Sequence, residues 1–223
     1  MPRPTPIPFP MVRRYFKDWA PKLIFDVGAN IGQTSVTYAT AFPEAIIHAF
    51  EPSPEAYQKL VENTSGFPNV VTHPFALGRT DAVLGFAQSS ASTRNRLLPA
   101  TAAGGENTIQ VQVRNGADAF RDLSASRIDY LKIDTEGHDY DVLLGMVPVL
   151  AQVDFIEVEA AMNPYNKTHV PIRKVEDLLW HLGFHLFHIM EQTMEWKRGG
   201  RPILRRSNPV FINGRFVDLR RID

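Results

Sequence analysis

The chain has 223 residues, with 24 basic and 24 acidic side chains, no cysteine and a formal net charge of zero. This length suits one α/β domain with a substantial core, and the zero net charge gives no overall attraction to nucleic acid or to a membrane surface. The absence of cysteine excludes disulfides and thiolate chemistry, and no apolar run approaches the roughly 20 residues of a membrane-spanning helix.

The N-terminal stretch MPRPTPIPFP is interrupted by prolines, so it lacks the apolar helical core of a signal peptide. We expect it to be extended, with a short helix following over residues 11–19. The chain then divides into an N-terminal segment, residues 1–20, and a single domain, residues 21–223. Without a signal peptide or a membrane span, the expected location is the cytoplasm.

The stretch IFDVGANIGQTS, residues 24–35, is typical of a buried strand, a glycine-bearing turn and the start of a helix. Its glycines let a ligand approach the backbone, and free N–H groups at the helix start favour an anionic group. The spacing differs from the G-x-G-x-x-G of dinucleotide-binding folds and resembles the D-x-G-x-N-x-G of Rossmann-like methyltransferases. That resemblance implies an S-adenosylmethionine site; the alternative is a turn without a ligand. The candidate cofactor residues are Asp26, Gly28, Asn30, Gly32 and Thr34.

A second strand, predicted over residues 45–50, ends at the acidic residue Glu51. A carboxylate at this position of an α/β fold can accept hydrogen bonds from both hydroxyls of a ribose. We therefore predict that Glu51 binds the cofactor ribose. Alternatively, it prepares the start of the helix predicted over residues 55–63.

The third strand is predicted over residues 70–77, and its end, with Ala76 and Leu77, is expected to contact the adenine of the cofactor. Residues 81–88 and 108–113 alternate in polarity as strands do, so they are predicted to form a hairpin-like insertion.

Four titratable residues follow the strand predicted over residues 130–133: Asp134, Glu136, His138 and Asp139. Asp134 stands at the carboxyl edge of the sheet, where open α/β folds bind their ligands. No other part of the sequence has such a density of titratable groups.

The segments that follow supply candidate acceptor contacts. Glu157 and Glu159 share one face of the strand predicted over residues 155–160, and the polar connection after it contains Tyr165 and His169. All four side chains are candidates for lining the cofactor or acceptor cleft.

The C-terminal part is predicted to close the sheet, with a helix over residues 172–182 and an antiparallel pair of strands over residues 184–190 and 210–212. It also contains a cluster of basic residues, interpreted either as a steering surface for an anionic substrate or as a solvated face. The basic cluster consists of Lys197, Arg198, Arg201, Arg205, Arg206, Arg215, Arg220 and Arg221.

Four blocks resemble the FkbM family of methyltransferases in the same order: FDVGANIGQTS, AFEPSPEAYQKL, FALG and LKIDTEGHDYDVLLG. The last block is the most specific, although Asp139 stands where the family usually has Glu. The resemblance implies a Rossmann-like class I methyltransferase fold of the α/β class, with a mostly parallel sheet, an antiparallel closing strand and helices on both faces. It also implies S-adenosylmethionine-dependent methylation, typically of a hydroxyl on a sugar or a natural product.

Methylation of a hydroxyl needs a base, because a neutral hydroxyl is a poor nucleophile, and it needs close alignment of the reacting atoms. Asp134 is the first candidate for this base, followed by Glu136 and His138. Asp134 could instead bind the cofactor, Glu136 could cap a helix, and His138 could simply be exposed.

A divalent ion is also conceivable, since the carboxylates near Asp134 and on the next strand are ligands that Mg²⁺ or Ca²⁺ accepts. No ligand spacing is diagnostic, so no metal ligand is assigned and a metal is not favoured. Two other classes stay open: a nucleic-acid methyltransferase that uses the basic cluster, and a non-catalytic nucleotide-binding module. We expect a small-molecule or saccharide acceptor, no nucleic-acid partner and no membrane span.

Overall fold

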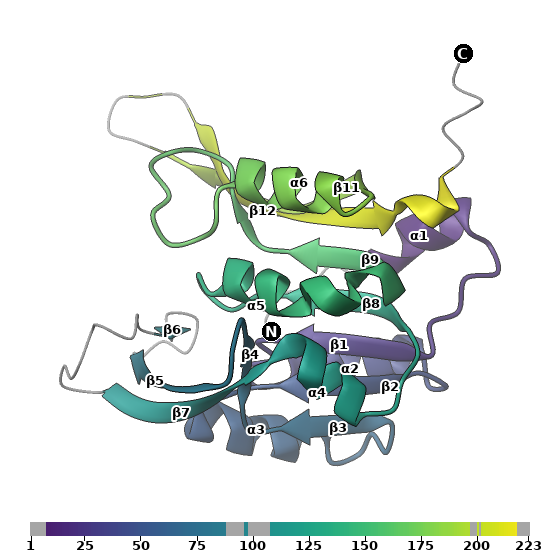
Figure 1. Cartoon of the computed structure of the whole chain (residues 1–223), viewed down its shortest axis with the longest axis vertical. Helices are drawn as coiled ribbons and strands as arrows, with labels where there is room; N and C mark the ends of the chain where they lie inside the picture. The colour runs from purple at the N-terminus through teal and green to yellow at the C-terminus, as the bar shows by residue number, and fades with distance from the viewer. Residues whose placement is uncertain (1–7, 88–95, 98–107, 197–199, 201, 218–223) are drawn as a thin grey trace.

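A central sheet of eight strands runs through the molecule (Figure 1). The computed structural model describes residues 8–87, 96–97, 108–196, 200 and 202–217. Five strands are parallel: β1 (Leu23–Val27), β2 (Ile46–Phe50), β3 (Val70–His73), β8 (Ile128–Ile133) and β9 (Val153–Val158). Antiparallel pairing closes the sheet through β10 (Ala160–Ala161), β11 (Phe184–Glu195) and β12 (Ile203–Asn213). The order β3–β2–β1–β8–β9–β12, with β11 beside β12, confirms the predicted mostly parallel sheet and its antiparallel closing strand.

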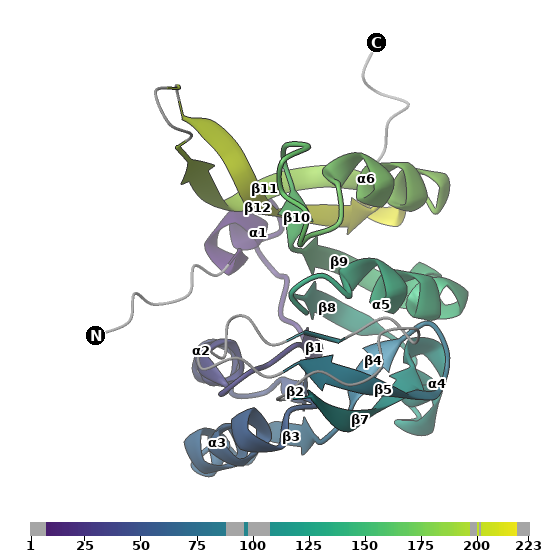
Figure 2. The same cartoon turned by 90° about the vertical axis from the view of Figure 1, so that its left-hand side faces the viewer.

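Helices cover both faces of this sheet (Figure 2). On one face lie α1 (Phe9–Tyr15), α2 (Gln33–Ala41) and α3 (Pro54–Thr64). On the other lie α4 (Gly116–Asp122), α5 (Asp139–Met146) and α6 (Ile172–His181). The described residues also form two short 3-10 helices, η2 (Val147–Gln152) after α5 and η3 (Gly214–Phe216) after β12. None of the helices in the described ranges is long and apolar enough to cross a membrane.

The central strands are buried on both faces, which explains their nearly continuous apolar sequences. All six residues of β8 and all six of β9 are buried. Buried polar residues interrupt the apolar pattern, and they include Asp26, Lys132 and Glu157, which are at most 3% exposed. Because buried charges are costly unless they are paired, these three residues need specific partners, which are described below.

A second, smaller sheet lies beside the central one, and it corrects the predicted third strand. It contains β4 (Ala76–Gly78), β5 (Ala82–Ala87), β6 (Arg96–Leu97) and β7 (Thr108–Asn115). The prediction of one strand over residues 70–77 is wrong: β3 stays in the central sheet, whereas β4 pairs with β7. Pro74 separates the two strands and has no N–H with which to continue the ladder. The antiparallel pairing of β5 with β7 confirms the hairpin-like insertion.

Part of the proline-rich N-terminal segment, which we predicted to be extended, belongs to the first helix and packs in the core. The first helix begins at Phe9, not at residue 11, and ends at Tyr15. Proline is tolerated in the first turn of a helix, so Pro10 does not delay its start. The Phe9 ring lies 4.9 Å from that of Tyr38 and 5.2 Å from that of Tyr130, which anchors α1 to the same core as the central sheet.

The closing strands are longer than the predicted ranges of 184–190 and 210–212. β11 continues to Glu195 and β12 begins at Ile203. We expected these added residues to form a connection, but they pair with each other and extend a two-stranded ribbon beyond the sheet. The ribbon exposes much of its surface, and its side chains therefore lack the continuous apolar pattern of a buried strand.

A close contact between α5 and β4 leads to a first testable prediction. A Cβ added at Gly145 would overlap the carbonyl oxygen of Gly78. We expect Gly145→Ala to lower the free energy of unfolding by about 1–3 kcal/mol or more, because the helix must move away from the strand. Urea denaturation measures this change. Gly66→Ala is the matched control, since no atom lies within 4 Å of a Cβ added there; equal losses in both variants would contradict the tight packing.

Candidate active site

The turn after β1 joins three neighbouring strand ends. The N–H groups of Gly28 and Ala29 both donate to the carbonyl of Phe50 at the end of β2, over 3.0 Å. Gly28 has a φ of +83°, and a Cβ there would overlap the carbonyl of Asp134 at the end of β8. Only glycine combines this backbone conformation with such a close approach. The turn therefore holds the carboxyl ends of β1, β2 and β8 together.

A pocket opens at these strand ends, with about 540 Å³ of empty space, part of it open to solvent. Six of the predicted cofactor residues line it: Gly28, Asn30, Glu51, Ala76, Leu77 and Asp134. They come from four separate segments, and the small second sheet supplies the apolar wall through Ala76, Leu77 and Phe86. The structure thus brings most of the predicted cofactor residues around one cavity.

The carboxylate of Glu51 is buried and held in place by the backbone. Its Oε2 accepts the N–H of Asn30 over 2.9 Å, and its Oε1 accepts the N–H of Ser53 over 2.8 Å. Burial raises the pKa of Glu51 to about 7, although both backbone hydrogen bonds oppose the shift. Since each carboxylate oxygen has a further lone pair, Glu51 can still accept two hydrogen bonds from a ligand.

Asp26 does not line the pocket. Its Oδ2 accepts the hydroxyl of Ser35 over 2.6 Å, and its Oδ1 lies 3.4 Å from the ammonium of Lys132. That ammonium also lies 3.4 Å from Asp134. Asp26 is therefore linked to the pocket residue Asp134 through the ammonium of Lys132. A direct contact of Asp26 with a cofactor stays a prediction.

Gly32 and Thr34, at the start of α2, are also outside the pocket lining. Gly32 has a φ of +89°, and a Cβ there would press against Leu60 of α3. Thr34 is 8% exposed within the helix. Gly32 thus allows α2 to pack closely on α3, and the predicted cofactor contacts of both residues remain predictions.

The three candidate bases occupy different surroundings. Asp134 and Glu136 both line the pocket, with side chains that are 31% and 28% exposed. His138 does not: its Nδ1 lies 3.6 Å from Asp141, and its ring packs against Gly78. Burial lowers the pKa of His138, which favours its neutral form. The geometry therefore favours Asp134 and Glu136 over His138 as groups that could reach a ligand.

Two further acids have structural partners. Asp139 accepts the N–H groups of Thr135 and Gly137 over 2.8 and 3.1 Å, which fixes the loop between β8 and α5. Glu157 accepts the hydroxyl of Tyr130 over 2.6 Å and the amide of Asn208 over 3.1 Å. Neither acid lines the pocket, and Glu159 is absent from the lining of both this pocket and the second cavity described below. The expectation that Glu157 and Glu159 line one cleft therefore stays a prediction.

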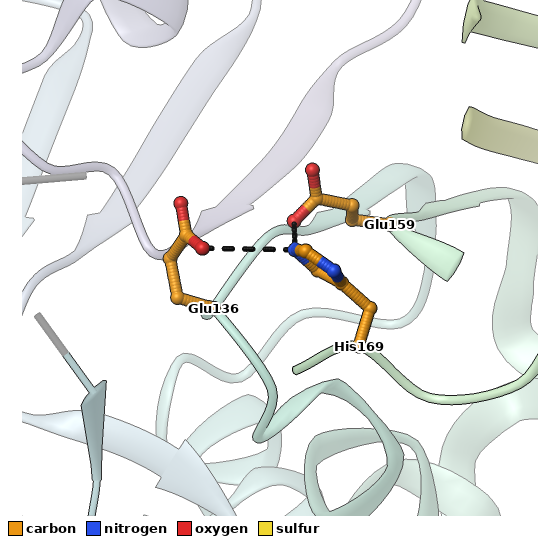
Figure 3. Close-up of side chains that lie close together, drawn as sticks. All are labelled: Glu136, Glu159 and His169. Atoms are coloured by element: carbon orange, nitrogen blue, oxygen red, sulfur yellow. Dashed lines mark ion pairs between the residues drawn. The ribbon is translucent and has the colours of Figure 1, made fainter. Parts of the chain in front are cut away.

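Glu136, Glu159 and His169 converge at the edge of the pocket, and we call them the Glu–Glu–His cluster (Figure 3). His169 Nε2 lies 2.6 Å from Glu159 Oε2 and 3.6 Å from Glu136 Oε2. His169 also lines a second cavity, with about 1010 Å³ of empty space that includes open solvent. The cluster therefore lies between two cavities, with Glu136 on the first and His169 on the second.

The polar connection around the second cavity contains two groups that were predicted to touch an acceptor. His169 is 6% exposed and belongs to the cluster. Tyr165 is 66% exposed and does not line the cavity; its N–H donates to Asn163 over 2.9 Å. Arg173, at the start of α6, also lines the cavity and was not predicted.

Members of the basic cluster pair with buried acids. Arg206 contacts the fully buried Glu159, and Arg215 contacts the fully buried Asp154. Neither arginine is simply part of a solvated face, which is one of the two interpretations offered by the sequence. Lys197, Arg198, Arg201, Arg220 and Arg221 lie outside the described residues.

Comparison with known proteins adds a family and two methyltransferase relatives. A sequence model of the methyltransferase FkbM domain matches residues 26–197. Hexuronic acid methyltransferase AglP of Haloferax volcanii is 27% identical over 66% of this chain and 59% of its own length. The 2-O-methyltransferase NoeI of Sinorhizobium fredii is 23% identical, with 70% of each chain covered. The chain thus spans less than two thirds of the length of AglP.

Solved structures with the same fold bind the cofactor or its product. The structure of M. capricolum TrmK with S-adenosyl-homocysteine has a TM-score of 0.53 at 9% identity, covering 95% of this chain and 70% of that one. Aeropyrum pernix fibrillarin with S-adenosyl-L-methionine has a TM-score of 0.50 at 11% identity, covering 86% and 66%. At such identities the likeness establishes the fold, which is that of Rossmann-like methyltransferases.

Proposed function

Because the chain belongs to the FkbM family of methyltransferases, we propose that it transfers a methyl group from S-adenosylmethionine to a hydroxyl of a sugar or natural-product acceptor. The observation that carries this proposal is the pocket at the strand ends, in which Glu51 and Asp134 face a common space. The names of AglP and NoeI support an oxygen acceptor on a sugar.

The polar atoms of the pocket wall fit this cofactor. Asn30 Oδ1 and Thr135 Oγ1 are buried and have no hydrogen-bond partner within the described part of the chain. Such atoms are costly unless a ligand satisfies them, and both belong to residues that line the pocket. Glu51 would hold the ribose hydroxyls, while Ala76, Leu77 and Phe86 would cover the adenine. The bound cofactor would supply an activated methyl group on its sulfonium.

Asp134 is the group that we propose as the base. Its carboxylate is partly exposed at the pocket and is steadied by Lys132 at 3.4 Å. From this position it could accept the proton of an acceptor hydroxyl as the new bond to oxygen forms. Glu136, the second candidate, lies on the same wall but also contacts His169.

The first test of the function is binding and transfer with purified protein. We expect S-adenosylmethionine to bind, and a nicotinamide dinucleotide not to bind, in isothermal titration calorimetry. Incubation with cofactor labelled in its methyl group, against a panel of uronic acids, neutral saccharides and structured RNA, should label a saccharide. Absence of S-adenosylmethionine binding would overturn the proposal, and labelling of RNA alone would favour a nucleic-acid methyltransferase.

A second prediction concerns the base. Asp134→Asn should lower turnover by roughly 100-fold or more, because a positioned base contributes about 10²–10⁴-fold. Its cofactor dissociation constant should change by less than about 3-fold, since the amide keeps the size of the side chain. Turnover with labelled cofactor and calorimetry separate the two effects. If turnover stays at the wild-type rate, Asp134 is not the base.

A further inference from the structure

We propose that the Glu–Glu–His cluster binds one divalent transition-metal ion, such as Mn²⁺. Its three side chains come from separate segments: the loop after β8, the end of β9 and the loop before α6. One ligand atom from each lies within 4.8 Å of the others. Ligand atoms bound about 2.1 Å from one ion lie about 3–3.5 Å apart, and the observed 2.6 and 3.6 Å bracket this separation.

The strongest observation is that the atoms facing each other are not hydrogen-bonded. His169 Nε2 and Glu159 Oε2 are buried and have no hydrogen-bond partner among the described residues, whereas Glu159 Oε1 is contacted by Arg206. The 2.6 Å contact between Nε2 and Oε2 therefore lacks the alignment of an N–H donating to an oxygen. Lone pairs that converge on a shared point, as in Figure 3, are what an ion requires.

Hydrogen bonds around His169 orient its ring in the way that is typical of metal-binding histidines. Its Nδ1 lies 3.1 Å from Oδ1 and 2.9 Å from Nδ2 of Asn166. We assign the proton to Nδ1, donating to Oδ1, because a proton on Nε2 would lack hydrogen-bond alignment with Glu159 Oε2. Oδ1 also accepts the N–H of Thr168 over 3.0 Å, which identifies the oxygen of the amide. Metal-binding histidines typically donate their other ring N–H in this way.

Glu159 is oriented in a similar manner. Arg206 contacts its Oε1, which turns Oε2 toward His169. The positive charge of Arg206 offsets one of the two carboxylates, and the net charge of −1 that remains favours a cation. Imidazole together with carboxylates suits Mn²⁺ or Zn²⁺, whereas Mg²⁺ and Ca²⁺ prefer ligands that are all oxygen.

The position of the cluster indicates what the ion would do, and this part rests on the proposed function. Glu136 lines the cofactor pocket and His169 lines the second cavity. Three protein ligands leave coordination positions open, and neighbouring sugar hydroxyls could occupy them. A bound ion lowers the pKa of a coordinated hydroxyl and fixes its direction. The acceptor would then lie in the second cavity, with one hydroxyl directed at the cofactor pocket.

Ion binding can be tested without any acceptor. Protein freed of metal by a chelator is titrated with Mn²⁺, and the signal of free Mn²⁺ is followed by electron paramagnetic resonance. We expect about one bound ion per chain and at least a 10-fold loss of affinity in Glu136→Gln and in His169→Ala. His181→Ala is the matched control, because His181 is exposed on α6 and outside the cluster. Circular dichroism verifies that each variant is folded.

The outcomes distinguish the two proposals. Equal Mn²⁺ affinity in the wild type and both cluster variants, or no binding at about 1 mM, would overturn the ion site. Glu136→Gln keeps this test valid if His169→Ala fails to fold, since Glu136 is partly exposed. Bound Mn²⁺ without S-adenosylmethionine binding would retain the ion site and remove the proposed function. Methyl transfer that is unchanged in chelator would overturn the role of the ion in orienting the acceptor.

Discussion

Glu51→Gln should lower the affinity for S-adenosylmethionine by about 100-fold or more. Both carboxylate oxygens of Glu51 already accept one backbone N–H, from Asn30 and Ser53, and have one lone pair each for the ribose. Hydrogen bonds to a charged group contribute about 1.5–3 kcal/mol each, and Gln removes one of them and makes the other a weaker bond to a neutral oxygen. The amide of Gln also turns an NH₂ group toward a backbone donor, which leaves that donor unsatisfied.

Isothermal titration calorimetry measures this loss, and Glu55→Gln is its control. Glu55 is exposed on α3 and pairs with Lys59, over 2.7 Å, so its substitution should change the cofactor affinity by less than about 2-fold. Wild-type affinity in Glu51→Gln would show that Glu51 serves the start of α3 and not the ribose.

The pKa of Glu51 adds a dependence on pH with a defined sign. Burial raises this pKa from 4.5 to about 7, and ribose hydroxyls donate to the ionised form. Cofactor affinity should therefore increase from about pH 6 to about pH 8, and Glu51→Gln should remove that part of the dependence. The free energy of unfolding of the ligand-free protein should do the opposite. Between pH 4.5 and about 7 the folded chain keeps a proton that the unfolded chain has released, so stability falls as the pH rises.

The central sheet could be predicted because its physical cause is local. Strands covered on both faces must be apolar throughout, and turn residues delimit them, so β1, β2 and β8 were located close to their true bounds. The end of β3 was missed because VVTHPFAL keeps an apolar character across Pro74. What changes there is the partner strand, from β2 to β7, and that choice depends on residues far along the chain.

Part of the site could also be predicted from the sequence, because the strands that position it have a local cause. Glu51 and Asp134 follow buried strands, and the carboxyl ends of parallel strands meet at one edge, so their common pocket was accessible to sequence reasoning. The different surroundings of Glu157 and Glu159 were not accessible. Glu157 is satisfied by Asn208, 51 residues away, through the pairing of β12 with β9, whereas Glu159 lies just beyond that pairing. Only the tertiary register separates two acids with the same local spacing.

Lys132→Met should cause one of the largest losses of stability in the chain, about 3–5 kcal/mol, because it leaves Asp26 buried without its cation. Burial lowers the pKa of Lys132, but the negative charges of Asp134, Asp26 and Glu157 outweigh it and raise that pKa above its ordinary value. The ammonium is therefore charged and central to a network of buried acids. The sequence signal for this network was a lysine between the apolar residues Leu131 and Ile133 of β8.

Urea denaturation of three variants isolates the effect. Lys59→Met removes an exposed pair on α3 and should cost at most about 1 kcal/mol. The double variant Lys132→Met/Asp26→Asn should recover part of the loss, because the amide needs no cation and can still bond to Ser35. If Lys132→Met proves as stable as Lys59→Met, then Asp26 is not left as an uncompensated charge. Recovery of stability in the double variant would instead establish that Lys132 compensates the charge of Asp26 inside the fold. Asp134 is then the member of the network that reaches the pocket.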